Sequence, residues 1–307
     1  YNPYLNLSVE SSLLDNHLPH TITLFIWKNK QTVVIGTNQN PYSECKVDEL
    51  LNEGGFLARR RTGGGAVYHD LGNLNFSFVA DKDIYDVKRQ MTVIQKALLN
   101  YGLETEVSGR NDITYQGRKF SGNAFAKTKH QGLHHGTILI KTDGEKLQRY
   151  LKVKPAKLHK HGVKSVASRV INLSEVADIT SENIIPHLIK AFEEVYQGKA
   201  KTVDFNELCS DEVARQSQYI GSDKYLYGKW KEFNTKKNAT FDWGSVEIDI
   251  DIDENKGIIK NINIASDSLD PASINLAIEI LKDASIHDKP IFPKDNIIVR
   301  DIVEMIY

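Results

Sequence analysis

This chain of 307 residues lacks several features that would place it in a specialised class of protein. Cysteine occurs only at Cys45 and Cys209, which are too far apart for a disulfide scaffold and favour a reducing compartment. No apolar run approaches the about 20 residues that a membrane-spanning helix needs, and there is no signal peptide, internal repeat or low-complexity tract. We therefore expect a globular cytoplasmic protein with no membrane contact, while a start at Tyr1 rather than Met leaves a removed organelle-targeting segment open.

The net charge of −1 predicts no polyanionic partner by itself, but the charge is unevenly distributed. Residues 241–307 carry 14 acidic and 6 basic side chains, so residues 1–240 carry a net charge of +7. This division is expected of a basic domain that attracts a phosphorylated small molecule or an acidic protein surface, followed by an acidic domain. Ordinary scatter of surface charge is the alternative. The basic residues form no recognition-helix pattern, which argues against binding to nucleic acid.

Hydrophobic periodicity predicts a mixture of helices and strands. In the first part of the chain the expected helices lie around residues 5–14, 47–51 and 87–101, and the expected strands lie over residues 21–27, 32–36, 73–80, 120–125 and 136–140. The first two strands are joined by a turn at residues 28–30. The strand over residues 73–80 alternates apolar and polar side chains, which predicts that one face is buried and the other is exposed.

The polar tract at residues 231–240 has no apolar period and is the predicted linker. After it, the pattern predicts a hairpin over residues 243–252 and 257–265 and a helix over residues 271–284 that begins at Asp270-Pro271. The expected domains are therefore residues 1–235 and residues 236–307.

Two features near the linker have simple structural interpretations. Trp243 is expected to pack between the two domains. The acidic run at residues 249–254 resembles the start of a calcium loop but has Glu254 where the loop needs glycine. We therefore expect the run to lie along an exposed strand edge.

The strongest motif is RRRTGGGAVYHDLGN at Arg59–Asn73. Consecutive glycines let backbone N–H groups point into one concavity, because glycine adopts positive φ and has no Cβ. The arginines supply planar donors that match phosphate or carboxylate oxygens. The motif predicts an anion-binding loop, with a mobile surface turn as the alternative. It is not a Walker loop or a dinucleotide fingerprint, since no Gly-Lys-Ser/Thr follows and the glycines are contiguous.

Two further motifs carry candidate chemistry. The segment Gly109–Gly122 holds Lys119, which could be a point charge in a site or a solvated loop lysine, with Asp112 just upstream. His135 belongs to HHGT at the start of a predicted strand, where adjacent histidines face opposite sides and cannot easily share a metal ion. We predict no metal site here, and His135 is either close to a ligand or a structural histidine. Neither cysteine lies in a nucleophile motif.

Taken in order, these motifs resemble those of the lipoate–protein ligase family, within the wider group that includes biotin protein ligases and octanoyl- and lipoyltransferases. The similar segments are RRRTGGGAVYHDLGN, RNDI with GRKFSGNA, and HHGTIL, followed by FDWGSVEIDIDID and ASDSLDPA, which are similar to the accessory domain of bacterial two-domain ligases. The resemblance implies an α/β (α+β) catalytic domain of mixed sheets flanked by helices. It also implies a small C-terminal accessory domain, whose acidic residues need not contact substrate.

The resemblance implies that ATP activates lipoate to lipoyl-AMP, with Mg²⁺ on the leaving pyrophosphate. The lipoyl group then passes to a lysine of lipoyl-domain proteins, namely 2-oxoacid dehydrogenase subunits and the glycine cleavage H protein. Lys119 is the predicted catalytic residue, as an electrostatic group rather than a nucleophile. The residues predicted to contact the nucleotide or the acyl adenylate are Arg60, Gly63, Gly64, Gly65, Ala66, Val67, Tyr68, Asn73, Asp112, Lys119, His135 and Thr137. A monomer is expected.

Three points stay open at the level of sequence. The apolar slot for the lipoyl chain could be lined by Val34, Phe76, Phe78 or Phe120. The choice between lipoate and octanoate is not fixed. A lipoyl- or octanoyltransferase of the same fold that does not use ATP is one alternative to a ligase, and a non-catalytic lipoyl-binding protein is another.

Overall fold

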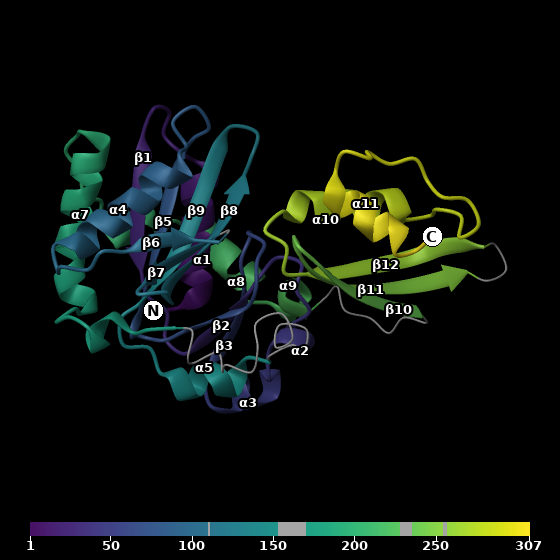
Figure 1. Cartoon of the computed structure of the whole chain (residues 1–307), viewed down its shortest axis with the longest axis horizontal. Coiled ribbons are helices and arrows are strands. Elements are labelled where there is room, and N and C mark those ends of the chain that lie inside the picture. The colour runs from purple at the N-terminus through teal and green to yellow at the C-terminus, as the bar shows by residue number, and fades with distance from the viewer. Residues whose placement is uncertain (110, 153–169, 228–234, 254–256) are drawn as a thin grey trace.

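The computed structural model describes residues 1–109, 111–152, 170–227, 235–253 and 257–307. Figure 1 shows two bodies side by side, a larger one formed by the chain up to residue 227 and a smaller one formed from residue 235 onward. Both combine helices with a β-sheet, which confirms the predicted α/β (α+β) class. Within the described ranges, no helix is both long and apolar enough to cross a membrane.

The larger body is built on a six-stranded sheet in which each strand is antiparallel to its neighbours. The strands in spatial order are β1 (Ile22–Trp27), β5 (Asn73–Asp81), β9 (Gln131–Leu139), β8 (Arg118–Lys127), β7 (Asp112–Tyr115) and β6 (Glu106–Ser108). A second sheet has the order β3 (Phe56–Arg59), β2 (Thr32–Ile35) and β4 (Val67–His69). β2 is parallel to β3 and antiparallel to β4. The strands β1 and β2, predicted around a single turn, thus belong to different sheets.

Two helices cover the apolar face of the six-stranded sheet. They are α4 (Val87–Leu99) and α7 (Ser181–Tyr196), which pack over Phe76 and Phe78 of β5. α4 begins where the Asp86 carboxylate accepts the N–H of Arg89, and the chain turns at Gly102, whose φ of +72° favours glycine. Among the described residues, the remaining helices of this body are α2 (Pro41–Glu44), α3 (Val47–Asn52), α5 (Gly144–Tyr150), α8 (Asp211–Ile220) and α9 (Asp223–Tyr227), with 3₁₀ turns η2 (Leu173–Glu175) and η3 (Phe205–Leu208).

The helix α1 (Pro3–Asp15) covers the opposite face of the six-stranded sheet and buries polar side chains there, including Asn6 and Glu10. These side chains find partners in the sheet. Ser77 of β5 accepts a hydrogen bond from Trp27 Nε1 at 2.9 Å and donates one to the Glu10 carboxylate at 2.5 Å. The prediction that β5 is half-exposed is therefore wrong, because α1 covers its polar face and satisfies its hydrogen bonds.

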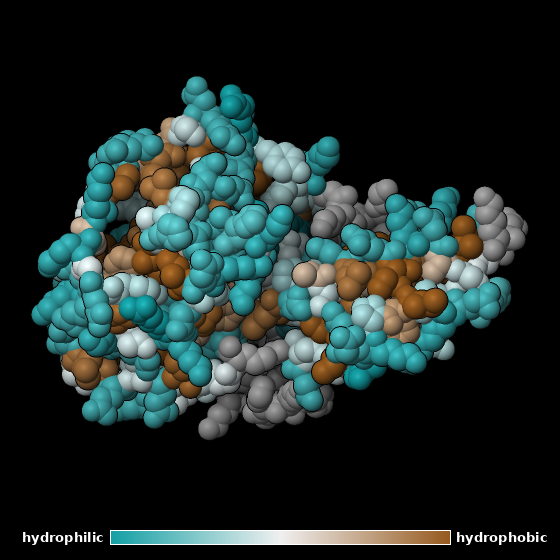
Figure 2. Space-filling model, turned by 90° about the horizontal axis from the view of Figure 1, so that it is seen from above, coloured by the Kyte–Doolittle hydropathy of each residue, from teal (hydrophilic) through white to brown (hydrophobic). Residues whose placement is uncertain are grey.

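The smaller body is a three-stranded antiparallel sheet of β10 (Thr235–Phe241), β11 (Gly244–Asp253) and β12 (Ile258–Ser266), with α10 (Pro271–Leu281) and α11 (Ile297–Glu304) on one face. The predicted hairpin and the predicted helix start at Asp270 are confirmed. Figure 2 shows apolar side chains gathered on the surface of this body. Ile291 and Ile297 are among its exposed residues.

Three predictions about the smaller body were wrong. Residues 235–240 are not a linker but part of β10, and residues 231–234 lie outside the described ranges. The acidic run is not at a sheet edge, because β11 is the central strand of its sheet. Trp243 packs on Phe241 and donates its Nε1 hydrogen to Asp301 at 2.9 Å, so its contacts lie within the smaller body.

Candidate functional site

A cavity of about 340 Å³ lies where α1, both sheets of the larger body and the loop before α10 meet. The predicted site residues that line it are Arg60, Gly64, Gly65, Ala66, Val67, Asp112, Lys119, His135 and Thr137. The other predicted residues, Gly63, Tyr68 and Asn73, lie outside its lining. Lining residues that sequence reasoning did not assign to a ligand include Leu7, Trp27, His69, Asn75, Asn123, Asp267 and Leu269.

The strand register sets five of the lining residues in a row across the six-stranded sheet. Trp27 of β1 pairs with Asn75 of β5, which pairs with Thr137 of β9. The N–H of Gly122 in β8 donates to Thr137 Oγ1 at 3.1 Å, and Gly122 pairs with Asp112 of β7. All five residues line the cavity. With about 4.8 Å between neighbouring strands, the row is about 19 Å long.

A cation stands at one end of this row. Lys119 Nζ lies 2.7 Å from Asp112 Oδ1, and both side chains are about one-third exposed, at 36% each. The ammonium group also passes close over Gly122, where a Cβ would lie 2.8 Å from Nζ. Glycine at this position therefore lets Lys119 lie along the floor of the cavity. Near Trp27 at the other end, Leu7 and Val34 supply apolar walls.

The predicted slot residues divide between this cavity and the core. Val34 lines the cavity. Phe76, Phe78 and Phe120 are fully buried in the core cluster on the far side of the six-stranded sheet.

The arginines of the motif bind mainly to other groups of the protein, whereas composition suggested that they bind an anionic ligand. Arg60 is buried and donates to the carbonyl oxygens of Val34, Gly63 and Gly65, at 3.1, 2.7 and 2.8 Å. Burial lowers its pKa to about 10, which still leaves it protonated at neutral pH. Arg59 is also buried among backbone carbonyls, and Arg61 pairs with Asp15 at the surface. Composition therefore predicted three anion ligands, whereas only Arg60 lines the cavity.

His135 is held in a buried network beneath the glycine loop. Its Nδ1 lies 2.8 Å from Glu10 Oε1, and its Nε2 lies 2.8 Å from Thr62 Oγ1, which also accepts from Arg60 Nε. His135 is thus both hydrogen-bonded within the protein and part of the cavity lining. Gly136 lines the cavity as well and is closely packed, because a Cβ there would overlap Asn123 and Phe76.

The loop before α10 closes one side of the cavity. The N–H of Gly64 donates to the carbonyl oxygen of Ser268 at 2.8 Å, with Gly64 at a φ of +88°. Nearby, the N–H of Ser266 donates to Asn38 O at 2.9 Å. Asp267 and Leu269 on either side of Ser268 line the cavity, so the acidic domain does border the candidate site. ASDSLDPA at residues 265–272 was the available signal, but sequence gave no reason to place it beside the glycine loop.

Cys45 offers no nucleophile to this site. It is a buried core residue outside the cavity lining, and burial raises its pKa to about 12. A thiol with this pKa is protonated at neutral pH and is a poor nucleophile. This agrees with the absence of a nucleophile motif around it.

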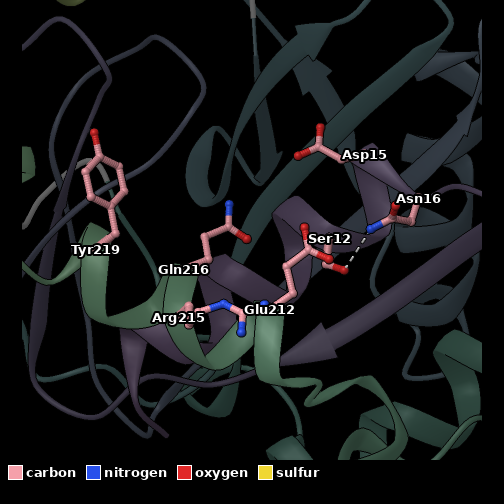
Figure 3. A pocket seen from close by; sticks show the side chains of 7 residues that line it. All are labelled: Ser12, Asp15, Asn16, Glu212, Arg215, Gln216 and Tyr219. Atoms are coloured by element: carbon pink, nitrogen blue, oxygen red, sulfur yellow. Dashed lines mark hydrogen bonds between the residues drawn. The ribbon is translucent and has the colours of Figure 1, made fainter.

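A second cavity lies between α1 and α8 and is shown in Figure 3. Its lining is almost wholly polar and includes Asp15, Glu212 and Arg215. None of the predicted site residues belongs to it. The central cavity is therefore the candidate site.

Sequence comparison identifies relatives over most of the chain. Residues 2–193 match the family model of the lipoyl protein ligase A/B catalytic domain. Residues 231–291 match that of the bacterial lipoate protein ligase C-terminus. The chain is 39% identical to lipoate-protein ligase A of Psychrobacter cryohalolentis over 297 residues, which cover 94% of this chain and 87% of the relative.

Solved structures of lipoate ligases are similar over three quarters or more of this chain. P. falciparum LipL1, in complex with lipoate, has a TM-score of 0.86 and 33% identity, with 99% of this chain and 96% of that chain covered. A bi-partite lipoate protein ligase from Thermoplasma acidophilum, described with its E2 lipoyl domain, has a TM-score of 0.65 and 26% identity, covering 76% and 95%. A lipoate-protein ligase A bound with ATP has a TM-score of 0.62 and 26% identity, covering 75% and 93%.

Proposed function

The chain belongs to the lipoate–protein ligase family and is a lipoate ligase, and from this premise we propose that it activates lipoate with ATP before transferring it to a protein lysine. In the first step the lipoate carboxylate attacks the α-phosphorus of ATP, giving lipoyl-AMP and pyrophosphate. In the second step the acceptor amine attacks the acyl carbonyl, an amide forms, and AMP leaves as the amine loses a proton. The observation that carries the proposal is a single cavity with a cation at one end and apolar walls at the other.

Lys119 is the proposed catalytic residue. Both steps concentrate negative charge on oxygen, first around the α-phosphorus and then on the acyl carbonyl. An ammonium group has three donors, so Lys119 Nζ can keep Asp112 as a partner and still bond to a phosphate or carbonyl oxygen. Asp112 then orients the ammonium group. Lys119 needs no covalent intermediate, because the adenylate is already an activated acyl donor.

The backbone of Gly64, Gly65, Ala66 and Val67 is proposed to contact the phosphate groups. Arg60 supports this loop by holding the carbonyl oxygens of Gly63 and Gly65, and His135 supports it through Thr62. Thr137 on the cavity floor is proposed to contact the acyl adenylate. For Tyr68 and Asn73, which lie outside the lining, we propose a supporting role in β4 and β5 in place of direct contact.

Mg²⁺ is proposed to accompany the nucleotide. In the described part of the chain, no group of three or more His, Cys, Asp or Glu side chains could hold a metal ion. Mg²⁺ commonly takes one or two carboxylates together with substrate phosphates, and Asp112 and Asp267 are the carboxylates that line the cavity. When bound, the ion would neutralise charge on the leaving pyrophosphate.

The proposed acceptors are lipoyl-domain proteins, namely 2-oxoacid dehydrogenase subunits and the glycine cleavage H protein. The archaeal relative described with its E2 lipoyl domain supports this choice. A cytoplasmic location and a monomeric state stay predictions.

The test is lipoate-dependent exchange of labelled pyrophosphate into ATP, followed by transfer to an apo lipoyl domain. We expect exchange with the purified protein and its loss in Lys119→Ala. Lys127→Ala removes another lysine of β8, outside the cavity lining, and should keep activity. Transfer from supplied lipoyl-AMP without any exchange would instead indicate a transferase of the same fold. Lipoate binding with neither activity would indicate a non-catalytic protein.

A further inference from the structure

We propose that His69 and Asn75 favour acyl substrates that carry a hydrogen-bond acceptor near the far end of the chain, such as the dithiolane sulfurs of lipoate, over plain alkanoates such as octanoate. The inference rests on the proposed function. Among the described residues that line the central cavity, these two hold buried side-chain polar atoms without a partner, His69 Nε2 and Asn75 Nδ2. Their side chains are almost fully buried, since His69 is 4% exposed and Asn75 is 1% exposed.

The surrounding hydrogen bonds identify the His69 atom as a donor. Asn6 Nδ2 donates to Asn29 Oδ1 at 2.8 Å, which fixes the orientation of the Asn29 amide. The Asn29 Nδ2 group therefore donates to His69 Nδ1, 3.2 Å away, and the ring proton resides on Nε2. Burial, with the charge of Arg60, lowers the pKa of His69 to about 3, so the ring is neutral at physiological pH.

In the amide orientation of the structure, the unpartnered Asn75 atom is also a donor. Asn73 Nδ2 donates to Asn75 Oδ1 at 2.9 Å, which leaves the Asn75 NH₂ group on the other side of the amide. Two of the residues that line the cavity thus hold neutral donors, and neither would attract the carboxylate of the substrate as a charge would. Two such donors match a weak, uncharged acceptor.

Strand spacing places these donors at the far end of an acyl chain. Asn75 lies two strands from Gly122, over which the Lys119 ammonium group passes, or about 10 Å. Seven carbon–carbon bonds of about 1.5 Å in zigzag extend about 9 Å. An extended eight-carbon acyl chain whose carboxyl group lies at Lys119 therefore ends beside Asn75. His69 lies on the same side, with its ring 6.1 Å from that of Trp27, the β1 partner of Asn75.

The two donors therefore act mainly by weakening the binding of acyl chains that carry no acceptor. An all-carbon tail leaves both N–H groups buried without a partner, whereas sulfur accepts weakly from them. A site built with donors discriminates against an analogue that lacks the acceptor more strongly than an apolar pocket discriminates by size. We expect each donor to contribute a roughly 3- to 10-fold preference.

The experiment compares kcat/KM for acid-dependent pyrophosphate release with lipoate, octanoate and 6-methoxyhexanoate, an ether of the same length as octanoate. The variants are Asn75→Leu and His69→Phe. Phe78→Leu is the matched control, since it changes the same strand on the opposite face. Ratios between acids within one variant cancel any loss of folded protein. Calorimetric binding of the three acids without ATP repeats the comparison independently of catalysis.

We expect the ratios of lipoate and of the ether to octanoate to fall about 3- to 10-fold in each cavity variant and to stay constant in Phe78→Leu. Ratios unchanged in both cavity variants, or changed equally in the control, would overturn the inference while leaving the ligase function intact. Absence of pyrophosphate release with every acid would count against the proposed function, and the binding ratios would then decide the inference alone.

Discussion

The contact between the glycine loop and the loop before α10 gives the sharpest structural prediction. A Cβ on Gly63 would overlap the Ser268 carbonyl oxygen and lie 3.1 Å from the Ser268 carbonyl carbon, inside the about 3.5 Å at which carbon atoms settle. Gly64 has a positive φ but Gly63 does not, so the backbone at Gly63 can accept alanine. Gly63→Ala should therefore separate the two loops without unfolding either body.

The size of the effect follows from the hydrogen bonds at this junction. Between described residues they include Gly64 N to Ser268 O, Ser266 N to Asn38 O, and Ser43 Oγ to Glu247 Oε2, and at about 1 kcal/mol each these three bonds hold the open state near 1%. Loss of all three bonds would make the open state dominant. Protection of the Gly64 amide against hydrogen exchange should fall about 100-fold.

Hydrogen exchange read by mass spectrometry on peptides spanning residues 62–66 measures this directly. Gly144→Ala is the control, because nothing lies within 4 Å of a Cβ at that position. It should leave exchange at residues 62–66 unchanged. Retained protection of Gly64 in Gly63→Ala, with an unchanged melting temperature, would refute the reasoning, since it would mean that the junction tolerates a side chain.

Three further predictions concern the site and its support. Cys45→Ala should keep nearly full ligase activity, because burial raises the thiol pKa to about 12; an inactive but folded variant in the exchange assay would argue for thiol chemistry. Arg60→Lys should lose the fork of contacts to Gly63 and Gly65, lowering both the free energy of unfolding, by about 2–3 kcal/mol in urea titrations, and the exchange rate; equal stability would contradict the supporting role. His69 and His134 have pKa values lowered to about 3 by burial, so the unfolded state binds protons that the folded state does not. Stability should be complete above about pH 6.5 and fall between about pH 6.5 and 3, by up to about 2.7 kcal/mol per pH unit for the pair; urea midpoints that do not change between pH 7.5 and 5 would contradict this.

The features that were predicted best from the sequence are those determined by residues close together along the chain. The helix over residues 87–99 and the hairpin of β11 and β12 follow from apolar period and capping residues that lie within the elements themselves. The cavity motifs at Arg60 and Lys119 were also visible as short segments. The fold class followed from the resemblance and was confirmed by the structure.

Features that depend on register and tertiary cover could not be predicted in this way. Trp27 and Asn75 border the cavity because β1 pairs with β5, and no local pattern encodes that pairing. The polar face of β5 looked exposed because its cover, α1, brings Glu10 from 67 residues away. Asp267 lies at the site through contacts between distant loops, such as that of Ser268 with Gly64. In each case the partner is distant in the chain.

The arginine and the glycines of the motif act together rather than as separate anion ligands. The C=O and N–H groups of a trans peptide point in opposite directions. Arg60 binds the carbonyl oxygens of Gly63 and Gly65, so the N–H groups of Gly64 and Ala66 must point away from Arg60. The first of these already donates to a carbonyl oxygen, that of Ser268. A phosphate oxygen that approaches Gly64 must therefore compete with Ser268, and binding of the nucleotide should be coupled to the position of the loop before α10.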